Sequence, residues 1–301
     1  MPENKNIGKL ERLYIKGYKS IKEMDINFGE INILIGANGA GKSNFIGFFR
    51  FMRMLIQKEL QLHIATEGGA NKLLFFGKKA TSQLHFNLLF PPNGYKATMI
   101  TDNADGLVFQ DETEYFNASN TNYEGGEKLY SIANIGGRES NLSNKGVSGY
   151  IIKYISDWKI YHFHDTGYSS PMKQTANIND NASLAEDGKN IASFLRRIKE
   201  ENYDNYTEIV DTIQRIAPFV QDFILEPETA NKDTIRLKWK HKGSSDYFDA
   251  SDFSDGTLRF ICLTVLLLQS NKPTTILLDE PELGLHPAAL NLVASLLKIA
   301  S

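Results

Sequence analysis

A glycine-rich loop between two apolar segments constrains the fold of this chain more than any other feature. Residues 36–43 read GANGAGKS, and they follow the apolar run Ile31–Ile35, which we interpret as a buried strand. After Ser43 the apolar residues recur at helical spacing, so the order is strand, loop, helix. Glycines let such a loop curl so that its amides point inward, close to the positive end of the following helix. This arrangement suits the oxygens of a phosphate group.

The loop matches the pattern G-x-x-x-x-G-K-[ST] at every position, which predicts a P-loop for a nucleoside triphosphate. A glycine-rich turn that binds nothing is the alternative, and the flanking strand and helix patterns disfavour it. The ammonium group of Lys42 suits the β- and γ-phosphates, so we assign it a catalytic role, and the hydroxyl of Ser43 suits Mg²⁺. We expect ATP and Mg²⁺ as cofactors, and we expect the nucleotide to contact Asn38, Gly39, Ala40, Gly41, Lys42, Ser43 and Asn44.

Two carboxylates stand at the end of a second apolar run. The run Ile276–Leu278 is typical of a buried strand, and Asp279 and Glu280 follow it directly. Ligands of open α/β sheets bind at the carboxyl ends of the strands. We therefore expect Asp279 to hold Mg²⁺ through water and Glu280 to act as the general base on the attacking water. Solvated acidic residues at a strand end are the alternative, which the P-loop in the same chain disfavours.

A third segment, FSDGTLR at residues 253–259, lies upstream of the carboxylates. Ser254 is a suitable N-cap, and Gly256 allows close backbone approach at a helix start that favours an anion. A capped helix without a ligand is the alternative. The order of the three motifs resembles that of ABC-type ATPases, in which such a segment is the signature motif and faces the γ-phosphate of a second subunit. The resemblance implies that Ser254 and Gly256 bind nucleotide across a head-to-tail homodimer.

The resemblance covers nearly the whole chain. The stretches ELGLHP at 282–287, LYIKGYKSI at 13–21 and YHFHDT at 161–166 are similar to those of a bacterial family of predicted ABC-type ATPases in the SMC, RecF and OLD-like branch. The fold implied is α/β: a P-loop ABC-type ATPase head with an antiparallel β subdomain and a small helical lobe. In that family a strand with a switch histidine follows the last helix. The sequence stops at Ser301 before such a strand, so we expect a C-terminally truncated ATPase core.

We divide the chain into four segments. Residues 1–62 hold the N-terminal strands, the P-loop and the first helix, and residues 63–183 form a β-rich insertion with a mobile loop near 117–149, with room for one short helix. Residues 184–250 form a helical lobe with a following strand, and residues 251–301 hold the signature helix, the carboxylate strand and a last helix. Periodicity predicts helices over 43–56, 184–199, 203–217, 254–269 and from 287, and strands near 13–15, 24–28, 84–88, 235–239 and 275–278, with one more within 151–163.

Composition and charge limit the kinds of partner that we expect for this chain. A net charge of −3 gives no global basic field, so nucleic-acid binding would need a local basic face, and Lys78–Lys79 and Arg196–Arg197 are only small clusters. Cys262 is the only cysteine, which excludes an internal disulfide and suits a reducing compartment. No apolar run is long enough to span a bilayer and the start lacks a signal peptide, so we expect a cytoplasmic protein without membrane contact.

The resemblance implies Mg-ATP hydrolysis at the dimer interface, driving a conformational switch that acts on DNA or on an effector protein in genome maintenance or phage defence. Two alternatives stay open: the ATPase part of an OLD-like nuclease whose catalytic domain lies beyond residue 301, and, less favoured, a transporter nucleotide-binding subunit. Gln83 is a candidate for the family's glutamine loop. His162, His164 and Asp165 have the spacing of metal ligands, but too few further ligands stand nearby.

Overall fold

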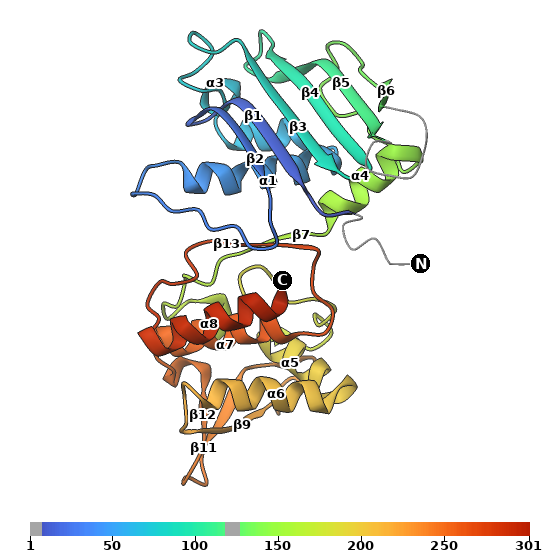
Figure 1. Cartoon of the computed structure of the whole chain (residues 1–301). Helices are drawn as coiled ribbons and strands as arrows, with labels where there is room; N and C mark the ends of the chain where they lie inside the picture. Colours follow the sequence, from blue (N-terminus) through green and yellow to red (C-terminus); the bar gives the residue numbers. More distant parts are fainter. Residues whose placement is uncertain (1–7, 118–126) are drawn as a thin grey trace. The chain divides into compact units, whose positions relative to one another are not determined.

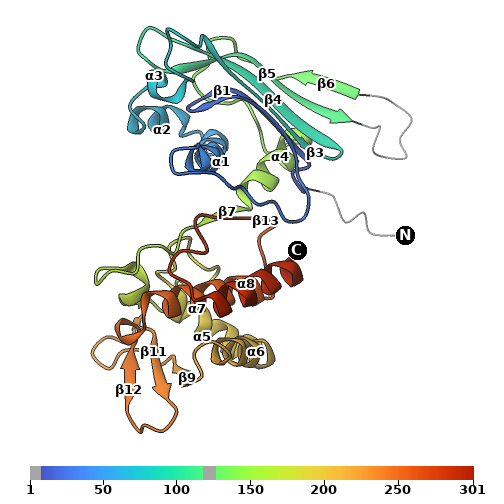
Figure 2. The same ribbon diagram turned by 60° about the vertical axis from the view of Figure 1, so that its left-hand side comes forward.

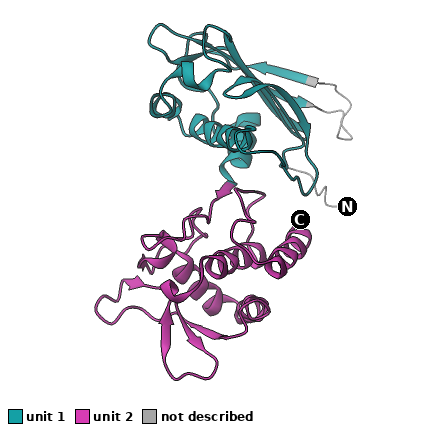
Figure 3. Cartoon of the chain, turned by 90° about the vertical axis from the view of Figure 1, so that its left-hand side faces the viewer, with its two compact units in different colours: residues 1–158 teal, residues 159–301 magenta. Residues whose placement is uncertain are grey.

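The computed structural model of the chain describes residues 8–117 and 127–301 (Figure 1). The chain forms two compact units, residues 1–158 and residues 159–301 (Figure 3). The P-loop belongs to the first unit, whereas the signature motif and the two carboxylates belong to the second. The finer division into four segments stays a prediction. Within the described residues, no helix has the length and apolar character needed to cross a bilayer.

The first unit is built on a six-stranded antiparallel sheet in the order β2-β1-β3-β4-β5-β6 (Figure 1). Side chains alternate between its faces, and Leu84, Phe86 and Leu88 are fully buried on one of them. The N-terminal strands and the β-rich insertion thus share one sheet, which confirms the strands predicted near 13–15, 24–28 and 84–88. The strands are β1 (Arg12–Tyr18), β2 (Ile21–Asn27), β3 (Gln83–Phe90), β4 (Asn93–Thr101), β5 (Leu107–Asn117) and β6 (Glu127–Ser131).

Helix α1 (Lys42–Ile56) packs on the buried face of this sheet, as the helical period after the P-loop predicts. The ring of Phe48 on α1 lies 5.7 Å from that of Phe86 on β3 and 5.5 Å from that of Tyr18 on β1. Such edge-on aromatic contacts add to the burial of apolar area and fix the helix against the sheet. The unit also contains α2 (Leu60–Thr66), α3 (Ala70–Leu73) and α4 (Gly146–Ser156).

The segment Ile31–Ile35 is not a strand, so that prediction is wrong. It pairs with no strand among the described residues, and the side chains of Ile33 and Ile35 are 79% and 92% exposed. Asn32 instead exchanges two side-chain hydrogen bonds with the Gly29 backbone, at 3.0 and 2.9 Å. A strand needs a neighbour that satisfies its backbone groups, and an apolar run reports hydrophobicity without reporting that neighbour.

The region near 117–149 holds more regular structure than predicted. Strand β6 lies within it, and α4 begins there, which agrees with the predicted short helix; residues 118–126 lie outside the described part of the chain. Helix α4 also occupies the first half of the range 151–163, where only β7 (Trp158–Tyr161) is a strand. An apolar run of this length suits a buried helix and a buried strand equally. Helical spacing is evident in the buried residues Ile151, Tyr154 and Ile155.

The second unit packs its helices around one apolar core, with α7 at the centre (Figure 2). These helices are α5 (Ile191–Glu201), α6 (Tyr203–Gln214), α7 (Asp255–Leu268) and α8 (Pro287–Ala300), with short 3-10 turns η2 (Pro171–Lys173) and η3 (Ala250–Asp252). Strands β9 (Val220–Ile224), β11 (Lys238–His241) and β12 (Tyr247–Asp249) form an antiparallel sheet. Strands β8 (Ala176–Asn177) and β10 (Thr234–Ile235) form one pair, and β7 and β13 (Thr275–Leu278) another.

The helices predicted over 203–217, over 254–269 and from 287 are confirmed, as is the strand at 275–278. The helix predicted from residue 184 starts only at Ile191. The side chain of Asn190 accepts a hydrogen bond from the Ala185 amide at 2.8 Å and so stabilises a non-helical turn. The single strand predicted near 235–239 is divided between β10 and β11, because its alternating apolar residues serve two different pairings.

Candidate functional site

The P-loop curves around two glycines in the left-handed region of backbone space. Gly39 has a φ of 83° and Gly41 a φ of 102°, values that residues with side chains rarely adopt. Inside the loop, the amide of Ala40 donates to the carbonyl of Ala37 at 3.1 Å. Helix α1 begins directly after Gly41, and no side chain among residues 8–117 and 127–301 caps it. Its first amides are therefore directed to the loop and suit an anion.

The ammonium group of Lys42 lies over this loop. Its Nζ donates to the carbonyl of Gly36 at 2.5 Å and to that of Ala37 at 3.2 Å. A phosphate in the loop offers charged acceptors, which form stronger hydrogen bonds than these two carbonyls. Ser43 is exposed in the first turn of α1, where its hydroxyl suits a hard cation. Amides, an ammonium and a hydroxyl are the donor set that a triphosphate with Mg²⁺ requires.

The turn between β1 and β2 supports the P-loop, a role that sequence reasoning did not assign. The hydroxyl of Ser20 accepts from the Asn44 side-chain amide at 2.8 Å. A Cβ atom at Gly41 would lie 2.6 Å from the same hydroxyl, so this position requires glycine for its contact as well as for its φ. Lys19 forms an ion pair with Glu67 at 2.7 Å. The signal in the sequence is a two-residue polar turn between two alternating strands.

An open cavity of about 540 Å³ lies beside this turn. It shares Ser20 and Asn44 with the support of the P-loop, and adds Lys19, Lys72 and Phe76. Phe76 is 83% exposed, so its ring face is accessible. The volume falls within the range of small-molecule sites, and the lining combines hydrogen-bonding groups with one aromatic ring.

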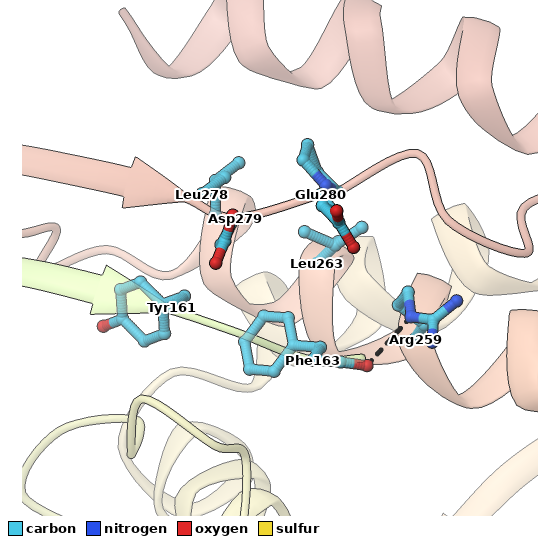
Figure 4. Close-up of a pocket in the computed structure, with 8 residues that line it drawn as sticks. Tyr161, Phe163, Arg259, Leu263, Leu278, Asp279 and Glu280 are labelled. Atoms are coloured by element: carbon cyan, nitrogen blue, oxygen red, sulfur yellow. Dashed lines mark hydrogen bonds between the residues drawn. The ribbon is translucent and has the colours of Figure 1, made fainter. Parts of the chain in front are cut away.

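In the second unit, Asp279 and Glu280 follow β13. The amide of Asp279 donates to the carbonyl of Tyr161 at 3.1 Å, so the pairing with β7 continues up to the carboxylates (Figure 4). Glu280 has a φ of 47°, a conformation uncommon for residues with side chains. It starts a turn in which the amide of Leu283 donates to the Glu280 carbonyl at 3.2 Å. Backbone strain of this kind, about 1–3 kcal/mol, clusters at functional sites.

The signature motif meets the turn that follows these carboxylates. Ser254 caps α7: its hydroxyl accepts from the Thr257 amide at 3.2 Å. Two residues on, a Cβ atom at Gly256 would lie only 2.3 Å from the carbonyl oxygen of Gly284. The start of α7 and the turn after β13 are thus in direct backbone contact, which brings the signature motif and the carboxylate turn together within one unit.

Sequence reasoning also missed Arg259, which lies one helical turn further along α7. It is only 4% exposed, and burial lowers the pKa of its guanidinium. Together with Asp279 and Glu280 it lines a cavity of about 10 Å³, close to the room that one water molecule needs (Figure 4). The signal in the sequence is a single charged residue within an otherwise apolar helix.

The remaining candidates find little support. Gln83 is the exposed first residue of β3, inside the antiparallel sheet of the first unit. The rings of His162 and His164 lie 5.6 Å apart. No group of three histidine, cysteine, aspartate or glutamate side chains in the described part of the chain is arranged to hold a metal ion. The site residues therefore form two groups: Asn38 to Asn44 in the first unit, and Ser254, Gly256, Asp279 and Glu280 in the second.

The loop and the carboxylates are the marks of a P-loop ATPase, and comparison with known families agrees. The chain belongs to the family described as "AAA domain, putative AbiEii toxin, Type IV TA system", whose model matches residues 31–301. AAA domains are P-loop ATPases and generally bind nucleotide with Mg²⁺, so the predicted class and its mixed α/β character are confirmed at this level. None of the curated proteins compared with the chain matches it.

Proposed function

We propose that the chain is an ABC-type ATPase head of the SMC, RecF and OLD-like branch that binds and hydrolyses Mg-ATP. The observation that carries this proposal is the curled P-loop, with Lys42 lying over it and an uncapped helix start behind it. The order of P-loop, signature motif and carboxylates supports the ABC-type branch. Family membership supports the nucleotide class.

Each residue has a distinct task in this proposal. The amides of residues 38–44 bind the phosphates, and Lys42 binds the β- and γ-phosphate oxygens. Ser43 and Asp279 would hold Mg²⁺, which neutralises phosphate charge when bound. Glu280, whose backbone lies in the left-handed region, accepts the proton of the attacking water. The open cavity beside Ser20 has room for the nucleoside.

Hydrolysis is assigned to a homodimer. Ser254 and Gly256 of one copy close over the nucleotide of the other, so ATP holds two heads together and its hydrolysis releases them. This switch would act on DNA or on an effector protein. The family description names a putative toxin of a toxin–antitoxin system, which supports an effector role in defence over a role in transport.

Nucleotide binding tests the P-loop assignment. Lys42→Ala should raise the Kd for Mg-ATP about 10- to 150-fold, because a hydrogen bond to a charged group contributes roughly 1.5–3 kcal/mol. Lys22→Ala, which removes an exposed lysine of β2, is the matched control and should bind like wild type. Isothermal titration calorimetry measures both. Wild-type affinity in the Lys42 variant would refute the assignment.

Turnover and dimerisation test the general base. Glu280→Gln keeps the shape of the side chain and removes its basicity, so it should bind Mg-ATP normally, hydrolyse it very slowly and accumulate as an ATP-bound dimer. Phosphate release and light scattering after size-exclusion chromatography measure these effects. Glu208→Gln, an exposed change on α6, should behave like wild type. Normal turnover by the Glu280 variant contradicts the role of that residue.

A further inference from the structure

The guanidinium of Arg259 ties three segments of the second unit together. Its Nε donates to the carbonyl of Phe163 at 2.8 Å, and its Nη2 to that of His164 at 3.0 Å. Its Nη1 donates to the carbonyl of Leu283. One buried side chain of α7 therefore holds both the loop after β7 and the turn after β13, and Figure 4 shows the bond to Phe163.

These hydrogen bonds of Arg259 are not part of a salt bridge. The ion pairs found in the described residues do not include Arg259, and its three acceptors are all backbone carbonyls. A buried charge is costly unless hydrogen bonds satisfy it, and an apolar residue at this position of an apolar helix would avoid that cost. The arginine is better explained by the geometry that its fork of donors imposes on two loops.

The two loops that it holds flank the carboxylates. Glu280 begins the turn that contains Leu283, and Arg259 lines the same small cavity as the two carboxylates. Steric contacts tighten the arrangement further. A Cβ at Gly284 would lie 2.7 Å from Arg259 Nη1, so a larger residue at this position would have to displace the guanidinium. The start of α7, with the signature motif, touches the same turn through Gly256.

We infer that Arg259 is a positioning residue for hydrolysis, which locks the turn carrying Glu280 to the helix start carrying Ser254 and Gly256. The general base and the signature motif then move as one body. The inference rests on the proposed function and adds a residue that contacts neither phosphate nor metal. Its loss should therefore lower kcat and leave Mg-ATP binding by the P-loop unchanged.

Two variants of Arg259 distinguish the effect of its hydrogen-bond geometry from the effects of its charge and of its packing volume. Arg259→Lys keeps the charge, but a single ammonium cannot reproduce a fork that reaches three carbonyls. Arg259→Met keeps much of the packing volume and removes every donor. Both should lower kcat about 10- to 100-fold with KM changed by less than about threefold, since a displacement near 1 Å can cost about 10²-fold in rate. Arg196→Lys is the control, because Arg196 also donates to a backbone carbonyl, that of Leu225.

Hydrogen exchange of the nucleotide-free protein gives a readout that does not depend on activity. Peptides covering 162–166 and 281–287 should exchange faster in both Arg259 variants, with α5 and α6 unchanged as internal references. Wild-type kcat in Arg259→Lys, or faster exchange spread evenly over the whole second unit, would overturn the inference. Failure of the wild-type chain itself to bind or hydrolyse Mg-ATP would instead overturn the proposed function.

Discussion

For the substitution Gly256→Ala, helix propensity predicts a more stable protein, whereas the packing in the structure predicts a less stable one. Gly256 is the second residue of α7, and alanine in a helix is favoured over glycine by about 1 kcal/mol. The structure places the new Cβ 2.3 Å from the Gly284 carbonyl oxygen, whereas a carbon–oxygen contact normally needs about 3.3 Å or more. The helix start and the turn must therefore separate by about 1 Å.

The stability change follows from these two effects. Overpacking of this size costs about 1–3 kcal/mol, which equals or exceeds the propensity gain of about 1 kcal/mol and leaves Gly256→Ala up to about 2 kcal/mol less stable. For a unit of this size the melting temperature falls by roughly 2–4 °C per kcal/mol. Because the signature motif is displaced from the turn that carries Glu280, kcat should fall at least about tenfold. Calorimetric unfolding and phosphate release measure the two effects.

Gly47→Ala is the matched control, since Gly47 lies inside α1 and its new Cβ would meet the Tyr18 hydroxyl at an ordinary 3.5 Å. There the propensity gain has no opposing clash, and stability should rise by up to about 1 kcal/mol. Unfolding of Gly256→Ala at or above the wild-type temperature, together with wild-type ATP turnover, would contradict the predicted clash with Gly284.

Three further predictions concern single side chains. Tyr95 donates to the buried Glu112 carboxylate at 2.7 Å, so Tyr95→Phe should destabilise the first unit by about 1–3 kcal/mol in denaturant titration; equal stability would contradict the contact. Burial raises the pKa of the Cys262 thiol to about 12, so iodoacetamide at pH 8 should label the unfolded chain only, and fast labelling of the native protein would disprove this. Burial, with Lys96 nearby, lowers the pKa of His85 in the folded protein. The neutral form of His85 therefore contributes stability that is present above the pKa of about 6.5 in the unfolded chain. This stability is lost as the pH falls through the pKa in the folded protein. The stability advantage of wild type over His85→Gln should therefore shrink between pH 7.5 and 5, and a constant difference would show that His85 does not titrate in this way.

The features that the sequence predicted correctly depend on interactions between residues close together in the chain. Helix α7 begins after Ser254 and α8 begins at Pro287, as expected, because an N-cap and a proline at the first helical position act within one turn of chain. The P-loop motif likewise lies in eight consecutive residues, and its curvature follows from its own glycines. Such features need no information about the rest of the molecule.

Features that depend on distant partners were missed. The exposed segment Ile31–Ile35 has the composition of a strand, but strand formation depends on a neighbour that its own residues do not specify. The acceptors of Arg259 lie 96, 95 and 24 positions away along the chain. Sequence alone marks this arginine as unusual within an apolar helix, and only the fold shows which loops it holds.

The starts of helices α1 and α7 differ in how readily they can bind an anion, and this difference predicts the order of steps in the proposed ATPase cycle. Helix α1 begins after Gly41, and no side chain in the described part of the chain caps it, so an anion there displaces no hydrogen bond of the helix. Helix α7 is capped by Ser254, whose bond to the Thr257 amide an anion must share or replace, at a cost of about 1 kcal/mol. Its first turn also carries Asp255, whose charge opposes an anion and is only partly offset by Lys173 at 3.5 Å. Nucleotide affinity should therefore reside mainly in the P-loop, and in the proposed homodimer the signature motif should engage only after a nucleotide is already held, so we expect dimer closure to follow binding.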